Sequence, residues 1–205
     1  MKKISGESRW GMTDKQLKKV ALIHFALHGY EGGSLTLIAK EVGIKKPSIY
    51  THFKSKEELF ISTFNDAVEC EILFIKKFIS ENKTKPLKTT LFSFLNKYLD
   101  NCKNERNTSF FLRTSFFPPV QLEKITKKGT DKYIFELEYI FRTLFYQKSD
   151  VLHSNVNPKT ATVAFITMLN GLLAEQLYGD PERLDERISE SWFVFWQGIS
   201  TEIYW

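Results

Sequence analysis

Residues Leu35–Lys56 read LTLIAKEVGIKKPSIYTHFKSK, and this segment indicates how the first third of the 205-residue chain is built. Ser34 is suited to cap a short helix over Leu35–Val42, because a serine oxygen accepts a free N–H of the first turn. Gly43 supplies the positive φ that a tight turn needs, and proline in the first turn favours a second helix over Pro47–His52. Two short helices about a glycine turn make a helix-turn-helix. Its small core is predicted to hold Ile38, Ala39, Val42, Ile44 and Ile49.

The second helix of this motif carries short polar and cationic side chains on its outer face and at its ends. They are Lys45, Lys46, Ser48, Tyr50, Thr51 and His52. Such groups suit the phosphates and base edges of DNA. Lys56 lies at the start of the next helix, where backbone N–H groups and the helix dipole also favour an anion. Ser55 and Glu58 have the spacing of a capping box that opens this helix.

The net charge of +5 lies entirely in the same part of the chain. Residues 1–60 hold eleven Lys/Arg and six Asp/Glu, whereas residues 61–205 hold eighteen of each. A basic segment on a neutral body favours a polyanion such as nucleic acid as its partner. Charge alone leaves open a solvated, lysine-rich surface that binds no such partner.

Residues 13–60 resemble the DNA-binding domain of the TetR family of transcriptional regulators. A glycine turn, a Tyr-x-His-Phe segment and a following lysine occur in register, and the matching residues are Phe25, Gly29, Tyr30, Ile38, Ala39, Val42, Gly43, Ile44, Tyr50, His52, Phe53, Lys56, Leu59 and Phe60. Beyond residue 60 only the helical architecture is similar. The resemblance implies a homodimeric repressor that binds a palindromic operator in double-stranded DNA. A small, largely apolar ligand is expected to release it.

The resemblance also implies which residues contact DNA. The expected DNA-binding residues are Thr36, Lys45, Lys46, Pro47, Ser48, Tyr50, Thr51, His52 and Lys56. Lys46, Pro47 and Ser48 form the expected base-facing group, whereas Thr36, Tyr50, Thr51, His52 and Lys56 are expected at phosphates. The sequence departs from the family pattern at Lys45 and Pro47. Because proline has no N–H to donate, Pro47 is expected to meet a base through apolar contact only. A buried capping role is the alternative for His52.

The whole sequence predicts an all-α fold, because apolar residues recur at helical spacing. Ten Gly and six Pro are also too few turn-forming residues for a fold of many β-strands. Residues 1–60 are the predicted DNA-binding domain. A long helix joins them to residues 61–205, the predicted ligand-binding and dimerisation domain. Outside the motif the predicted helices are Asp14–His28 (with Thr13 as N-cap and Gly29 as the stop), Lys56–Ile79, Pro86–Lys103, Arg106–Phe117, Val120–Gln147, Lys159–Tyr178 and Glu182–Tyr204.

The last two predicted helices are apolar on more than one face. A helix that is apolar nearly all round must be covered on all sides, which favours a twofold four-helix interface between two copies. Gly171 and Ala174 would let another helix approach closely. The apolar stripe of the last helix holds Leu184, Ile188, Trp192, Phe195, Trp196, Ile199 and Ile203. The alternative is that both are core helices of a monomer.

The central helices are rich in phenylalanine, and the family keeps its ligand pocket there. Aromatic walls with few polar groups suit an apolar or aromatic ligand. The expected lining is Phe94, Phe111, Phe116, Phe141 and Phe165, with Asn170 as a polar anchor. Individually, most of these phenylalanines are equally consistent with a solid core. A DNA-binding protein of the same fold without a small ligand is therefore the alternative.

Enzymatic, metal and membrane functions are not favoured. No nucleophile–base pair or phosphate loop is visible, so an enzyme that uses the aromatic pocket is the weakest alternative. His24 and His28 have a metal-binding spacing but no evident third ligand, so no metal or cofactor is expected. No apolar run approaches the about 18 residues of a membrane span, and the N-terminus does not read as a signal peptide. The two cysteines, Cys70 and Cys102, form no CxxC motif, which favours the reducing cytoplasm.

Overall fold

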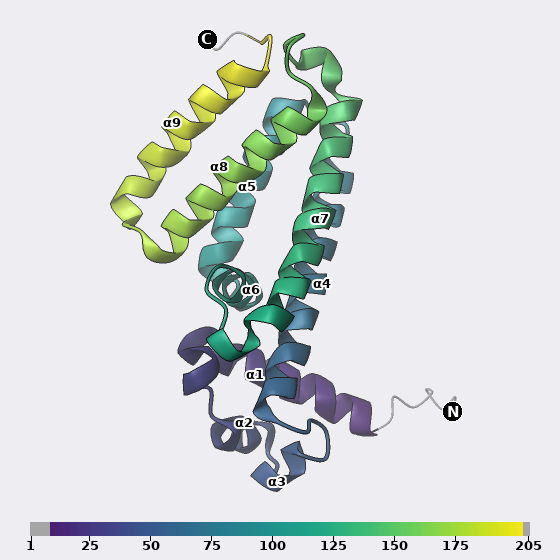
Figure 1. Ribbon diagram of the computed structural model, residues 1–205, viewed down its shortest axis with the longest axis vertical. Coiled ribbons are helices and arrows are strands. Elements are labelled where there is room, and N and C mark those ends of the chain that lie inside the picture. The colour runs from purple at the N-terminus through teal and green to yellow at the C-terminus, as the bar shows by residue number, and fades with distance from the viewer. Residues whose placement is uncertain (1–8, 203–205) are drawn as a thin grey trace, which may run out of the picture. The chain divides into compact units, whose positions relative to one another are not determined.

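The computed structural model describes residues 9–202, with side chains from Thr13 onward, and the predicted all-α fold is confirmed (Figure 1). Within this range every regular element is helical. The elements are α1 (Arg9–Gly32), α2 (Leu35–Val42), α3 (Lys46–Ile49), α4 (Lys56–Asn82), α5 (Leu87–Asn104), α6 (Arg106–Phe116), η1 (Val120–Leu122), α7 (Glu123–Gln147), η2 (Ser149–Val151), α8 (Pro158–Tyr178) and α9 (Pro181–Ile199).

The chain forms two compact units, and their boundaries fall inside α4, between α5 and α6, and inside α7. The first unit combines the residues through Val68 with Arg106–Thr130, and the second combines Glu69–Glu105 with the residues from Asp131 onward. Helix α6 therefore belongs with the helix-turn-helix, which the pattern of the sequence did not indicate. The functional division at residue 60 stays a prediction.

The helix-turn-helix forms from the local signals that predicted it. The Ser34 side chain accepts the N–H of Leu37 at 3.4 Å, which caps α2. Gly43 adopts φ 81° in the left-handed region, which a residue with a Cβ rarely enters. Its N–H donates to the Lys40 carbonyl at 3.1 Å. Ile38, Ala39 and Ile49 are buried and close the small core of the motif.

The first helix is longer at both ends than predicted. It begins at Arg9, so Thr13 lies inside the helix and is not its N-cap. Gly29 takes φ 66°, as a helix stop would, but the chain turns there and continues helically to Gly32. The N–H of Gly33 then donates to the Gly29 carbonyl at 3.1 Å, and this bond closes the loop before α2.

The last helix is shorter than predicted, because it ends at Ile199 and not at Tyr204. An isolated β-bridge pairs Leu152 with Ser200, and the N–H of Thr201 donates to the Val151 carbonyl at 3.0 Å. These bonds hold the chain after α9 against the segment before α8. They supply a partner for the backbone N–H of Thr201 without a further helical turn. Ile203 of the predicted stripe and Tyr204, the predicted end of the helix, lie outside the described residues.

Among the helices of residues 9–202, none combines the length and the apolar content that crossing a membrane requires.

Candidate nucleic-acid interface

The segment that carries α3 presents four of the predicted DNA-binding residues to solvent. Lys45 precedes α3 in extended conformation, Lys46 and Pro47 open the helix, and Tyr50 follows it. All four are exposed, and Tyr50 exposes 49% of its surface. Buried Ile49 anchors the segment from its other side. The arrangement places two cations and a phenol on one accessible surface.

Three hydroxyl residues were predicted at the same interface. Thr36 is exposed in the first turn of α2, and Ser48 is half-buried in α3. Thr51 is exposed, but its hydroxyl donates to the Ser48 carbonyl at 2.7 Å. The only hydroxyl proton of Thr51 is used in that bond, so a phosphate would have to compete for it.

His52 is largely withdrawn from solvent, with 8% of its side chain exposed. Its Nδ1 lies 2.5 Å from the Asp14 Oδ1, and this contact ties the chain just after α3 to α1. This geometry is consistent with the buried structural role that the sequence left open. A phosphate contact by His52 stays a prediction.

Lys56 is held by two groups that sequence reasoning missed. Its Nζ donates to the Glu31 carbonyl at 3.0 Å and lies 4.7 Å from the centre of the Tyr30 ring. A cation over an aromatic face is attracted by the ring quadrupole. Near Lys56, the Glu58 N–H donates to the Ser55 hydroxyl at 3.1 Å, as the capping box predicts. The Glu58 carboxylate, however, accepts from the Lys54 N–H and not from Ser55.

The paired histidines of α1 contribute to packing within the first unit. His24 Nε2 lies 3.0 Å from the Glu41 Oε2, a contact that joins α1 to α2. The His28 ring lies 6.2 Å from the His24 ring, centre to centre. Within the described part of the chain, no three His, Cys, Asp or Glu side chains gather as a metal site would require.

Of the six predicted ligand-binding residues, three come together in the second unit. The ring of Phe141 lies 4.9 Å from the rings of both Phe94 and Phe165, centre to centre, and all three are fully buried. Asn170 is half-buried further along α8. Phe111 and Phe116 belong to α6 in the first unit, where Phe111 stacks on Phe64. A ligand site built from these residues stays a prediction.

A buried polar cluster in the second unit was not foreseen. The hydroxyls of Tyr98 and Tyr133 lie 2.8 Å apart, and both residues are buried. Glu71 of α4 exposes only 2% of its surface and lies close to Tyr98. Burial, with Tyr133 and Glu71 close by, raises the pKa of Tyr98 well above its usual 10.0. Burial also raises the pKa of Tyr133.

These two tyrosines should make the protein less stable in alkali. Above pH 10 the unfolded tyrosines ionise while the folded ones stay neutral, so the free energy of unfolding falls as the pH rises, by about 1.4 kcal/mol per pH unit for each such group. The raised pKa values therefore place full stability below pH 10. Urea titrations at pH 8, 10 and 11 measure the slope. Tyr133→Phe should reduce it, with Tyr146→Phe on the exposed side of α7 as control. An unchanged slope in Tyr133→Phe contradicts the assignment.

The aromatic residues predicted at the dimer interface are buried inside a single chain. Trp192 is 3% and Trp196 0% exposed, and the Phe195 ring packs 5.7 Å from the Phe165 ring. A charge at Phe195 would therefore disrupt the core of the unit and would not report on association. The exposed face of α8 is different in kind: it carries small side chains at one-turn spacing, namely Ala164, Thr167 and Gly171. Helix α9 lies beside α8 (Figure 1), and its Val194 is 67% exposed.

Comparison with known proteins points to one family. The model of the tetR family of bacterial regulatory proteins matches residues 19–63. Over 109 residues the chain is 32% identical to IcaR of Staphylococcus aureus (strain Newman), the HTH-type negative transcriptional regulator of the biofilm operon icaADBC. IcaR of Staphylococcus epidermidis is 30% identical over 107 residues. Each match covers 52% of this chain and 55% of the relative, so the chain spans about half the length of the curated relatives it matches.

Solved structures match over nearly the full length. One is NalD of Pseudomonas aeruginosa, the secondary repressor of the MexAB-OprM multidrug efflux pump, with TM-score 0.69 and 18% identity over 96% of this chain and 100% of that one. Another is FadR of Bacillus subtilis in complex with stearoyl-CoA, with TM-score 0.64 and 19% identity over 90% of this chain and 98% of that one. Identities this low establish a shared fold only.

Proposed function

Because this chain belongs to the TetR family of bacterial regulatory proteins, we propose that it is a transcriptional repressor that binds a twofold-symmetric operator as a homodimer. The observation that carries this proposal is the solvent-facing group Lys45, Lys46, Pro47 and Tyr50 on a helix-turn-helix of intact geometry. Lys45 supplies charge toward phosphates, whereas Lys46, Pro47 and Ser48 at the start of α3 supply the contacts to base edges.

Base reading is assigned to the start of α3 and phosphate binding to its surroundings. Lys46 and Ser48 carry hydrogen-bond donors, whereas Pro47 offers only apolar contact, which suits a thymine methyl group. Tyr50, Thr36 and Lys45 surround them with exposed polar groups. Lys56 needs to leave the Glu31 carbonyl, or share its protons with it, to reach a phosphate. That requirement makes Lys56 a link between DNA contact and the end of α1.

Association through α8 and α9 supplies the twofold symmetry. The small residues Ala164, Thr167 and Gly171 let a facing helix approach closely, and exposed Val194 adds apolar surface on α9. Symmetric dimers bury the same patch on both copies. Two recognition helices related by this twofold axis would read two half-sites of one palindrome.

A ligand-free regulator is the second candidate, and the buried phenylalanine cluster favours it. Phe94, Phe141 and Phe165 fill the space between them at contact distances. A ligand at these rings would have to displace them. Family membership still supports a ligand-released repressor as the first choice.

Selection of random duplex oligonucleotides on the full-length protein tests the proposal. The expected product is a palindrome whose half-site centres lie about one helical turn apart or a multiple of it. Binding to it should weaken steeply with salt, with a log–log slope close to the number of phosphates contacted. Enrichment of no common sequence, or of a site without twofold symmetry, would overturn the proposal.

A further inference from the structure

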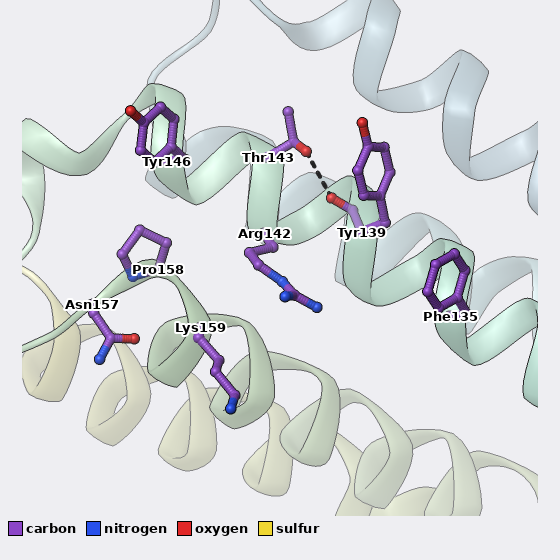
Figure 2. Close-up of a pocket in the computed structure, with 8 residues that line it drawn as sticks. All are labelled: Phe135, Tyr139, Arg142, Thr143, Tyr146, Asn157, Pro158 and Lys159. Atoms are coloured by element: carbon purple, nitrogen blue, oxygen red, sulfur yellow. Dashed lines mark hydrogen bonds between the residues drawn. The ribbon is translucent and has the colours of Figure 1, made fainter.

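A pocket of about 580 Å³ opens on the second unit between α7 and the start of α8 (Figure 2). Its size lies within the roughly 300–1,000 Å³ of small-molecule sites. None of the six residues predicted to bind ligand lines it. The pocket is therefore a separate feature from the buried phenylalanine cluster.

Three large aromatic side chains on α7 line the pocket while facing solvent. Phe135 is 70%, Tyr139 61% and Tyr146 74% exposed. Figure 2 draws them with Arg142 along α7, at the three- and four-residue spacing of side chains that share a helix face. Exposed apolar surface gathered in a concave site marks a place where something binds. Flat aromatic rings on one wall suit a flat aromatic partner.

The charged side chains of the pocket indicate that this partner is an anion. Arg142 extends from α7 into the space between the helices, and Lys159 lies on α8 opposite (Figure 2). Among the described residues that line the pocket there are two cations and no carboxylate. Glu138 pairs with Arg142 at 3.7 Å, but both side chains are about half exposed. Such a pair is weak in water, so an incoming anion can replace it.

We propose that this pocket binds a small aromatic anion, an arene carboxylate or sulfonate, with its ring on the α7 aromatics and its charge on Arg142 and Lys159. A charged acceptor gains most from a guanidinium, which offers a planar fork of donors. The site goes beyond the proposed DNA-binding function and does not depend on it.

The test uses two fluorescent probes that differ in charge. They are 1-anilinonaphthalene-8-sulfonate and N-phenyl-1-naphthylamine, which has the same ring system without the sulfonate. The wild-type chain is expected to bind the sulfonate at one saturable site per chain. Arg142→Gln with Lys159→Gln should weaken sulfonate binding about tenfold or more and change binding of the neutral probe less than about twofold. Arg142→Lys with Lys159→Gln should bind the sulfonate more tightly than Arg142→Gln with Lys159→Gln does.

Matched variants separate the pocket from other binding modes. Tyr139→Ala with Tyr146→Ala should weaken both probes, because it removes the ring platform. Lys77→Gln with Lys85→Gln removes the same charge from exposed positions elsewhere on the unit and should change neither. All these side chains are exposed, and circular dichroism melting curves verify that the variants fold.

Three outcomes would overturn the proposal. Sulfonate binding that is unchanged in Arg142→Gln with Lys159→Gln would place the probe elsewhere, the buried phenylalanine cluster included. Absence of a saturable site in the wild-type chain would remove the pocket as a small-molecule site. A lower sedimentation coefficient in Tyr139→Ala with Tyr146→Ala would assign the groove to a second copy of the chain.

Discussion

Gly171→Glu is expected to convert the proposed dimer into monomers and to abolish tight binding to an operator with two half-sites. Gly171 is exposed on α8, and beyond the adjoining backbone of α8 a Cβ added there would meet no atom of the described chain within 4 Å. Glutamate also favours a helix more than glycine does, so the monomer should stay folded. In the proposed dimer the carboxylate would be buried against the partner. An unpaired buried charge costs about 3–5 kcal/mol, which is on the order of 10² to 10³-fold in affinity.

Sedimentation velocity at micromolar concentration measures the change from dimer to monomer, and titration with operator DNA measures the accompanying loss of affinity. Ser80→Glu is the matched control, because it adds the same charge at an exposed position of α4 in the same unit. The control should stay dimeric and bind the operator normally. A dimeric Gly171→Glu chain would exclude this face of α8 from the interface. A wild-type chain that sediments as 24.0 kDa would exclude the dimer and the symmetric operator together.

Substitutions at the proposed DNA interface should separate into two kinds. Lys46→Ala and Ser48→Ala are expected to change which base pair is preferred, because each removes a donor at the start of α3, and one good base contact is worth about 1–3 kcal/mol of discrimination. Lys56→Ala is expected to weaken binding to all sequences alike and to lower the salt slope by about one. Competition binding with a library of single-base operator variants, repeated at several salt concentrations, distinguishes the two patterns.

The surroundings of Lys56 require a stability control for this experiment. Its loss also removes the hydrogen bond to the Glu31 carbonyl and the contact with the Tyr30 ring, so the melting temperature of each variant must be measured. Lys83→Ala removes one charge from an exposed position beyond the helix-turn-helix and should leave sequence preference unchanged. If Lys46→Ala lowered affinity uniformly, Lys46 would be a phosphate contact and not a base-reading residue.

Local signals predicted the helix-turn-helix well. The helix over Leu35–Val42 has the bounds that Ser34 and Gly43 indicate, because a cap and a positive φ act within a few residues of the chain. The same reasoning placed most of the later helices to within a few residues, since helical spacing of apolar residues reports which face is buried. It failed at the ends of α1 and α9, where bonds to distant segments or a change of direction at Gly29 set the boundary.

The sequence likewise predicted some features of the candidate sites and not others. Residue types and helix positions predicted that Lys45, Lys46 and Tyr50 lie on an outer surface, and the structure exposes all three. Their contact with DNA stays a prediction. Pattern alone could not tell whether an apolar helix face meets its own chain or another. Trp192 and Phe195 fit both readings, and they are buried because α9 packs on residues far away in sequence, such as Phe92 and Phe165.

The sequence also could not predict which polar groups form hydrogen bonds with one another. The hydroxyls of Tyr98 and Tyr133 are 35 residues apart in the chain and 2.8 Å apart in space, and Lys56 finds the Glu31 carbonyl 25 residues before it. Periodicity assigns a residue to a face of its own helix but carries no information about which helix faces it. Helix caps and most helix positions can therefore be predicted from interactions between residues close together in the chain. The phenylalanine cluster, the buried tyrosine pair and the pocket between α7 and α8 arise only when packing brings distant helices together.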